Sequence, residues 1–405
     1  MRVLFVTWAT PGHLFPMVPL AWAFQAAGHD VRVAAPDSCA TAIGHAGLSA
    51  VPTGAPVDLR ALSRPEDTAV WDTDKHWPAG WPGRPELLSD GQTRMLAFAA
   101  ERQHAVAGAM LDELLAFARW FRPELVIHDP LAFAGPVAAA VLGVPSLAHG
   151  WEVATVLGSE RSRRRDGYAP GYAALFERYG AEPRPCTARV IDPSPPGMRG
   201  AISTGTEVLD MRYVPYNGPS TAPFPPAAQG GRPRICFTSG VALGKYEASD
   251  LTRAVSSMLD LTSGLDVDTV LAIGPGQRDL LPTLPPGTLV AENTPFHLLL
   301  PLCDAVVHHG GAGTAMTAVA TGVPQLVIAQ SPIYTEVGRS VAAGGAGIVL
   351  TEDQQRPATV TEALSRLLDG ASPYRAALAA VREEMAAMPS PAQVAADLAR
   401  TVTAA

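Results

Sequence analysis

The stretch HHGGAGT at residues 308–314 has the composition of an anion-binding loop. Its three glycines let a ligand approach the backbone closely, and the apolar run that follows them predicts a helix. Because a helix N-terminus carries partial positive charge, Gly311 and the N–H groups of Gly313, Thr314 and Ala315 would favour a phosphate or diphosphate. A tight turn between strand and helix is the alternative, but it needs one glycine rather than three.

The two histidines of this stretch differ in what they can reach. Neighbouring residues on a strand point to opposite faces, so His308 and His309 cannot easily bind one metal ion. We expect His308 to be buried or to lie behind the ligand contacts, and His309 to face the phosphate.

A second loop rich in small residues, TSGVALG at 238–244, also follows a predicted strand. Alone it is a weak signal, but in the same domain as HHGGAGT it is placed to contact the other side of the same diphosphate. Its candidate contacts are Ser239, Gly240 and Val241.

A third candidate group is His13, in the loop TWATPGH that follows the first apolar run of the chain. This loop lacks the GxGxxG spacing of a dinucleotide-binding turn, so a nicotinamide or flavin site is not indicated there. Taken alone, a histidine at this place is best interpreted as an exposed neighbour of a helix N-cap.

The elements that precede these loops predict parallel sheets. In the first half, the hydrophobic patterns give strand 2–7, helix 17–30, strand 31–36, strand 124–129, helix 130–143 and strand 145–150. In the second half they give strand 235–240, strand 268–274, strand 288–292, helix 296–303, strand 304–310, helix 313–322 and strand 324–329. Strands alternating with helices indicate doubly wound parallel sheets, whose ligands bind at the carboxyl ends of the strands.

The predicted class is α/β, with two Rossmann-like doubly wound domains facing across a cleft. A proline- and glycine-rich stretch, in which neither hydrophobic period survives, separates the two patterns and predicts a linker. We expect an N-terminal domain over 1–212, the linker over 213–233 and a C-terminal domain over 234–388. Residues 389–405 should form a last helix that packs back on the N-terminal domain.

Composition narrows the possible functions. With 405 residues, 47% of them hydrophobic, and a formal net charge of −8, the chain is expected to be compact and not to bind nucleic acid. Its four scattered cysteines fit a reduced, cytoplasmic compartment, and we find no signal for secretion or for a membrane span. The pair Asp266 and Asp268 has the D-x-D spacing of some metal sites, but it precedes a strand, so we interpret it as a surface turn.

Several of these motifs together resemble one enzyme family. HHGGAGT, the preceding PFHLLLPLCDAVV, the following GVPQL and the N-terminal GHLFPMVPLAWAFQAAGHDV are similar to the nucleotide-sugar glycosyltransferases of the GT-B fold. The likeness is to the actinobacterial enzymes that decorate polyketides, macrolides, enediynes and related natural products. It extends from residue 1 to about residue 400.

The resemblance implies a role for each matching residue. It makes His13 the general base that deprotonates the acceptor hydroxyl, and Asp129, in VIHDPLAF, the carboxylate that holds it. A helix cap is the alternative for Asp129. His309, with the glycine-rich loop, would stabilise the leaving diphosphate of a TDP-sugar or another nucleotide sugar. The expected reaction is inverting transfer of a deoxysugar, with no metal and no cofactor.

The remaining assignments also depend on the resemblance. Pro295 and Phe296 are expected near the nucleobase, although Thr294 stands where relatives carry an aromatic residue. Gln330 and Glu336 are candidates to bind the sugar. The resemblance also implies that the domain over 1–212 binds the acceptor and that the domain over 234–388 binds the nucleotide sugar. The acceptor, a small hydrophobic molecule, is assigned to Trp8, Trp77 and Trp151, with ordinary aromatic packing as the alternative.

Two other functions are compatible with the fold. One is a nucleotide-sugar epimerase or hydrolase, which would need acid and base carboxylates around the sugar that the sequence does not offer. The other is a non-catalytic homologue that activates a partner transferase, but such a protein would have no need of His13. A homodimer and an auxiliary activator protein are possible partners.

Overall fold

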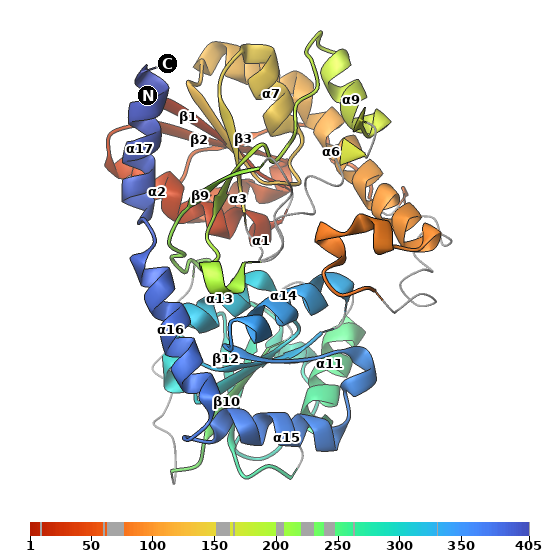
Figure 1. The fold of residues 1–405 in the computed structure, drawn as a ribbon, viewed down its shortest axis with the longest axis vertical. Helices are drawn as coiled ribbons and strands as arrows, with labels where there is room; N and C mark the ends of the chain where they lie inside the picture. Colours follow the sequence, from red (N-terminus) through yellow and green to blue (C-terminus); the bar gives the residue numbers. More distant parts are fainter. Residues whose placement is uncertain are drawn as a thin grey trace. The chain divides into compact units, whose positions relative to one another are not determined.

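The computed structural model divides into two compact units, which Figure 1 colours along the chain. Unit 1 comprises Met1–Ser194, Gly200–Val214 and Met388–Ala405, and unit 2 comprises Pro195–Arg199 and Pro215–Ala387. The structure describes residues 1–8, 10–59, 61–62, 77–150, 163–164, 167–199, 206–219, 231–238, 248–261, 264–329 and 331–404. Within these ranges, no helix combines the length and the apolar character that a membrane span requires.

Unit 1 is built on a seven-stranded parallel sheet with the strand order β3-β2-β1-β4-β5-β8-β9. Its strands are β1 (Arg2–Val6), β2 (Asp30–Ala35), β3 (Ala50–Pro52), β4 (Leu125–His128), β5 (Ser146–His149), β8 (Arg189–Asp192) and β9 (Glu207–Asp210). β4 is buried along its whole length, as expected of a central strand covered on both faces. A short antiparallel pair, β6 (Arg163–Arg164) and β7 (Gly167–Tyr168), lies outside this sheet.

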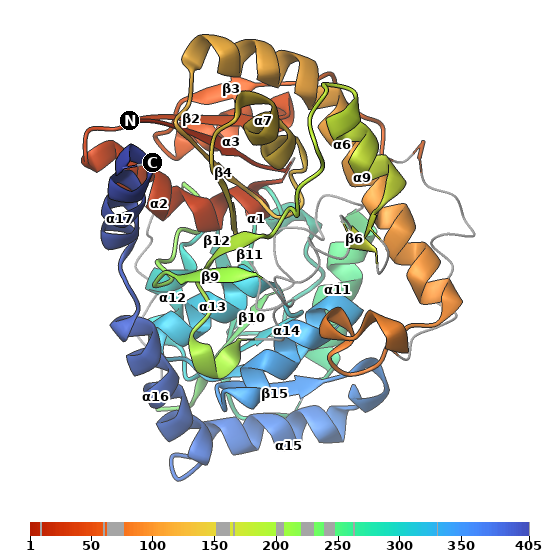
Figure 2. The same cartoon turned by 45° about the horizontal axis from the view of Figure 1, so that its top comes forward.

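Helices cover both faces of this sheet. They are α1 (Pro11–Leu14), α2 (Val18–Ala26), α3 (Ala40–His45), α6 (Asp90–Phe121), α7 (Ala134–Leu142), α9 (Pro170–Glu177) and α17 (Pro391–Ala404). On one face, the Phe5 ring packs edge-on against Phe24 of α2. On the other, His128 packs against Gly135 of α7, where a Cβ would lie 2.4 Å from the His128 Cβ. The long helix α6 begins with a capping box at Ser89 and runs alongside α9 (Figure 2).

The last helix of the chain, α17, packs against α2 in unit 1 (Figure 1). The helix before it, α16 (Pro373–Ala387), belongs to unit 2. The segment between α16 and α17 is held by a hydrogen bond in which the Arg212 N–H donates to the Pro389 carbonyl at 2.7 Å. Ser390 then caps α17, because its hydroxyl accepts from the Gln393 N–H at 3.3 Å.

Unit 2 holds a six-stranded parallel sheet with the order β12-β11-β10-β13-β14-β15. Its strands are β10 (Arg234–Thr238), β11 (Asp268–Ile273), β12 (Leu289–Glu292), β13 (Ala305–His308), β14 (Gln325–Ile328) and β15 (Gly347–Leu350). Its helices are α11 (Ala248–Leu261), α12 (Phe296–Leu299), α13 (Ala312–Thr321), α14 (Pro332–Ala343), α15 (Pro357–Leu368) and α16. The predicted class, two parallel α/β domains, is confirmed.

Two predicted helix boundaries are wrong. The helix predicted from Pro130 begins only at Ala134, because the four residues before it form a turn on Asp129. The helix predicted from Gly313 begins at Ala312, with Gly311 in extended conformation as its N-cap. The second shift changes which backbone N–H groups the glycine-rich loop can offer.

The interpretation of Asp266 and Asp268 as a surface turn is right only for Asp266, whose side chain is 86% exposed. Asp268 is the first residue of β11 and its side chain is 11% exposed, and both carboxylates accept from the Arg232 guanidinium. Part of the predicted linker is fastened to unit 2, because the Asn217 side chain accepts from the His297 N–H at 3.2 Å and donates to the Thr317 hydroxyl at 3.3 Å.

Candidate active site

His13 and Asp129 are brought together at the carboxyl edge of the unit 1 sheet. β1 and β4 are neighbours with Val6 opposite His128, so the loops that follow them emerge side by side. The Asp129 N–H donates to the Val6 carbonyl at 2.9 Å, which fixes the start of the second loop. The His13 Nδ1 then lies 2.7 Å from the Asp129 Oδ2. The contact predicted between these two residues is present.

Asp129 has a role for each of its carboxylate oxygens. Oδ1 accepts from the Leu131 N–H at 2.6 Å and shapes the turn before α7, while Oδ2 contacts His13. The carboxylate is fully buried and the His13 side chain is 15% exposed. Because an ionised carboxylate can only accept hydrogen bonds, this contact places the His13 proton on Nδ1 and leaves the lone pair on Nε2. The arrangement suits a histidine that takes a proton from another molecule.

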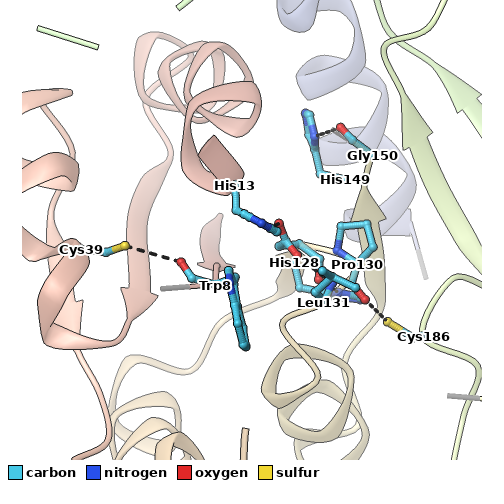
Figure 3. A network of polar contacts seen from close by, with 10 residues as sticks. Trp8, His13, Cys39, His128, Pro130, Leu131, His149, Gly150 and Cys186 are labelled. Atoms are coloured by element: carbon cyan, nitrogen blue, oxygen red, sulfur yellow. Dashed lines mark hydrogen bonds and ion pairs between the residues drawn. The ribbon is translucent and has the colours of Figure 1, made fainter. Parts of the chain in front are cut away.

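Two polar side chains close to this pair, those of His128 and Cys186, are uncharged. His128 is buried beside it, with its Nδ1 3.0 Å from the Asp129 carbonyl, and burial lowers the pKa of His128 to about 4. On the far side of the turn, the Cys186 thiol donates to the Pro130 carbonyl at 3.1 Å (Figure 3), and burial raises its pKa. Both groups are therefore neutral near pH 7. Asp129 supplies the negative charge beside His13 at this edge.

The tryptophans predicted to bind the acceptor divide into three cases. Trp8 lies beside His13, with ring centroids 6.2 Å apart, and its carbonyl accepts from the Cys39 thiol at 3.5 Å. Trp77 is buried and packs edge-on against Trp81 at 4.9 Å, which fits the packing alternative. Trp151 lies outside the described residues.

In unit 2, His308 is held as a structural residue. It is fully buried at the end of β13, as expected, and both ring nitrogens have partners. Its Nδ1 accepts from the Gly310 N–H at 3.1 Å, so its Nε2 carries the proton and donates to the Gln325 Oε1 at 2.9 Å. The Gln325 amide in turn donates to the Ala315 carbonyl at 3.2 Å. This chain of bonds fixes the turn between β13 and α13.

His309 differs from His308, because its Nδ1 is buried without a hydrogen-bond partner in the described structure. The ring packs edge-on against Tyr334 of α14, with centroids 4.8 Å apart. Burial, and secondarily the neighbouring His308, lower the pKa of His309 to about 3, so the imidazole is neutral. A buried, unpaired ring nitrogen is costly, which indicates a partner that arrives with a ligand.

The glycines of the loop are explained in part by packing. Gly310 has φ +105°, and a Cβ there would lie 2.7 Å from the Tyr334 Cβ and 2.8 Å from its carbonyl oxygen. At Gly311 a Cβ would lie 2.9 Å from the His309 Nε2. At Gly313 nothing lies within 4 Å of a Cβ, so this position has open space in front of it. Two of the three glycines thus serve the local fold, whereas no packing contact requires a glycine at position 313.

One predicted backbone donor is wrong. The Ala315 N–H donates to the Gly311 carbonyl at 3.0 Å and closes the first hydrogen bond of α13. The helix geometry instead directs the N–H groups of Ala312, Gly313 and Thr314 out of its N-terminal end. The donor set therefore moves one residue toward the N-terminus.

The other predicted contacts of unit 2 are only partly described. Pro295 is the buried N-cap of α12, and Phe296 packs against the core around Cys236. Glu336 is buried on α14, where its carboxylate accepts from Arg339. The other predicted contacts, Ser239, Gly240, Val241 and Gln330, lie outside the described residues.

Sequence reasoning missed Tyr334, which covers both His309 and Gly310. The signal that could have found it is the helix start SP at residues 331–332, since Ser331 caps α14 by accepting from the Tyr334 N–H. Tyr334 lies in the first turn of α14, and α14 packs against α13. Only the strand order, however, makes α13 and α14 neighbours.

Comparison with known sequences places the chain in one family over nearly its whole length. The family described as erythromycin biosynthesis protein CIII-like matches with its N-terminal domain at residues 22–240 and its C-terminal domain at residues 256–401. The 10-deoxymethynolide desosaminyltransferase of Streptomyces venezuelae is 35% identical, with 99% of this chain and 97% of that protein covered. The TDP-daunosamine transferase DnrS of Streptomyces peucetius is 36% identical, with 97% and 95% covered.

Comparison of structures agrees with the sequences. The spinosyn rhamnosyltransferase SpnG, solved in complex with thymidine diphosphate, matches with a TM-score of 0.78 at 29% identity over the full length of both chains. The paired α/β units are those of GT-B glycosyltransferases. The chain belongs to the erythromycin biosynthesis protein CIII-like family of natural-product glycosyltransferases.

Proposed function

We propose that this enzyme transfers a deoxysugar from a TDP-sugar to a hydroxyl of a hydrophobic natural product, with inversion at the anomeric carbon. The observation that carries the proposal is the 2.7 Å contact between the His13 Nδ1 and the Asp129 Oδ2. The relatives named for TDP-daunosamine transfer and for thymidine diphosphate binding support the donor class. The relative named for 10-deoxymethynolide supports a macrolactone or similar acceptor.

The first step assigned to the protein is removal of the acceptor proton. The His13 Nε2 takes this proton as the acceptor oxygen attacks the anomeric carbon, and Asp129 stabilises the imidazolium that forms. The buried carboxylate keeps its position because the Leu131 N–H holds its second oxygen. Attack by the acceptor itself on the face opposite the leaving group, with no covalent sugar intermediate, gives inversion.

The second step is stabilisation of the leaving diphosphate. As the glycosidic bond breaks, negative charge develops on the β-phosphate oxygen. The N-terminal end of α13 offers backbone N–H groups at the positive end of its dipole. His309, neutral and with its Nδ1 unpaired in the described structure, supplies an N–H once the proton sits on that nitrogen. In this proposal these donors perform the task that a divalent cation performs in other transferases, and no metal is needed.

A donor and acceptor panel tests the proposal. The purified enzyme is given TDP-desosamine, TDP-daunosamine, TDP-rhamnose or UDP-glucose with each of several hydroxylated macrolactones and anthracyclinones, including 10-deoxymethynolide. We expect transfer from at least one TDP-deoxysugar, an inverted anomeric configuration by NMR, and unchanged rates with EDTA. Faster transfer from UDP-glucose than from every TDP-deoxysugar would overturn the donor assignment. Absence of transfer to every acceptor would favour a non-catalytic role.

A further inference from the structure

His149 is a buried histidine to which the mechanism above gives no task. It ends β5, is fully buried, and its Nδ1 lies 2.8 Å from the carbonyl oxygen of Gly150 (Figure 3). Since a carbonyl only accepts, Nδ1 carries the proton and Nε2 is left as an acceptor. That Nε2 is buried and has no hydrogen-bond partner in the described structure.

The register of the sheet places His149 next to the catalytic pair. β4 and β5 are parallel, with His128 opposite Ala148. One residue further along the chain in each case, Asp129 therefore lies beside His149. Paired residues of parallel strands point to the same face. His128 points to the α7 face, so Asp129 and His149 point to the opposite one. This is the face on which Asp129 meets His13.

His149 is uncharged at this edge. Burial lowers its pKa to about 4, against a smaller opposing effect of the Gly150 carbonyl and of the nearby Asp129 carboxylate. In a neutral imidazole whose proton is on Nδ1, the Nε2 can only accept a hydrogen bond. The group that fits it is therefore an O–H or N–H donor.

Of the four buried histidines of the described structure, His149 and His309 each have one ring nitrogen without a hydrogen-bond partner. The hydroxyls of Thr7 and Ser372 are also buried without a partner there. Both nitrogens of His308 have partners, through Gln325 and Gly310. His309 has an unpaired nitrogen, and it lies on the loop proposed to bind the donor. Because an unpaired acceptor in the interior is destabilising, its presence at the catalytic edge points to a ligand that completes it.

We propose that His149 is a specificity-determining residue, whose Nε2 accepts a hydrogen bond from a second hydroxyl of the acceptor, next to the hydroxyl that receives the sugar. This inference rests on the proposed function, since it requires a hydroxylated acceptor bound at His13. The enzyme then selects acceptors with a hydroxyl pair. It discriminates against acceptors in which the second hydroxyl is missing or alkylated.

The test uses two substitutions and two acceptors. His149→Gln keeps an acceptor oxygen near the place of Nε2, whereas His149→Phe removes it and keeps an aromatic ring. His45→Phe, at an exposed histidine of α3, is the matched control. The acceptors are the macrolactone or anthracyclinone diol that the wild-type enzyme converts fastest and its methyl ether at the hydroxyl next to the transfer site.

We expect His149→Phe to raise the KM for the diol by about 10- to 100-fold, the range expected of one buried hydrogen bond. The KM for the TDP-sugar and the kcat should change little, and His149→Gln should retain most of the affinity. The methyl ether should raise the wild-type KM by a similar factor and have no further effect in His149→Phe. The His45→Phe control should match the wild-type enzyme with both acceptors.

Three results would overturn the inference. The first is an unchanged diol KM in His149→Phe, and the second is an equal loss in both substitutions, which would indicate packing. The third is a wild-type enzyme that binds the diol and its methyl ether with equal affinity, a result that needs no substitution. If instead the wild-type enzyme transfers sugar to no acceptor, the proposed function fails. A transferring wild-type enzyme with one of the three results leaves that function standing and removes the role of His149 alone.

Discussion

The histidines of the proposed mechanism, His13 in unit 1 and His309 in unit 2, differ in their hydrogen-bond partners. In unit 1, His13 is oriented by a buried carboxylate, and Asp129 is itself held by the Leu131 N–H. In unit 2, His309 has no carboxylate partner, and its Nδ1 is unpaired in the described structure. In the proposed mechanism this difference has a purpose, because Asp129 fixes the tautomer of the base before the acceptor binds, whereas the partner of His309 would be the diphosphate itself.

The same contrast holds for electrostatics. Unit 1 places a negative charge beside the histidine, which favours the imidazolium formed when a proton is taken. Unit 2 offers backbone dipoles at the start of α13, and they favour negative charge on a ligand. Similar doubly wound sheets thus support opposite chemistry, since the loop after the strand, rather than the fold, sets the sign of the local potential.

The largest expected effect comes from breaking the unit 1 pair. His13→Ala should lower kcat by about 10²- to 10⁴-fold, the usual contribution of a general base. Asp129→Asn should also be severe, because the amide can keep the bond from the Leu131 N–H while its NH₂ group forces the His13 proton onto Nε2. Steady-state rates measure both, with Trp120→Ala on the exposed face of α6 as control. Near wild-type rates in either variant would remove the base assignment.

The second prediction concerns unit 2 and separates the two regions. His309→Ala should lower kcat by about 10²- to 10³-fold, as for loss of one donor to a developing oxyanion. It should also weaken binding of thymidine diphosphate, measured by calorimetry, whereas His13→Ala should leave that affinity unchanged. Equal loss of diphosphate binding in both variants would contradict the division of labour between the units.

Much of this comparison was accessible from the sequence, for a physical reason. Alternating strands and helices predict parallel sheets, and parallel sheets place the loops that follow neighbouring strands at one edge. His13 and Asp129 follow β1 and β4, and the family resemblance pairs them. Their contact follows from the strand order. Their chemical roles remain predictions until the variants are measured.

The parts that could not be predicted depend on single hydrogen bonds and on packing between distant segments. Because the Leu131 N–H donates to Asp129, the chain forms a turn there and α7 begins only at Ala134. Because Gly311 is the N-cap of α13, the Ala315 N–H is bonded within the helix and cannot donate to a ligand. Each shift is too small for hydrophobic periodicity to detect. His149 was missed because PSLAHG looks like an ordinary buried strand, and only the register shows that its last side chain lies beside Asp129.

A third prediction tests how much of the glycine loop serves the fold. Gly310→Ala should destabilise unit 2 by about 2 to 4 kcal/mol, since φ is +105° and the new Cβ would meet Tyr334. Gly313→Ala is the matched control for stability. Its Cβ has nothing within 4 Å, so it should be neutral or stabilising by up to about 1 kcal/mol. Urea unfolding measures both, and equal destabilisation would contradict this packing account.

The smallest effect for a single residue applies to both units and concerns pH. Burial lowers the pKa to about 4 for His128, His149 and His308, and to about 3 for His309. The pKa of a histidine in the unfolded chain is near 6.5. As the pH falls below that value, the unfolded chain therefore binds protons at these histidines that the folded chain does not bind. Each of these histidines therefore contributes stability that is present above pH 6.5 and is lost as the pH falls toward the folded pKa. Between pH 7 and pH 5.5 the loss is about 1 kcal/mol for each histidine.

Urea unfolding at these two pH values measures that loss. Replacing one buried histidine in each unit, His149→Phe and His308→Phe, should make the pH dependence shallower by about 1 kcal/mol over the same interval. His45→Phe, which removes an exposed histidine, should leave the dependence as it is in the wild-type enzyme. A dependence that is equally steep in all four proteins would mean that these imidazoles take up protons in the folded state. In that case His149 would not remain purely a hydrogen-bond acceptor as the pH falls, and the contrast between a carboxylate-held histidine in unit 1 and a neutral, unpaired His309 in unit 2 would have to be revised.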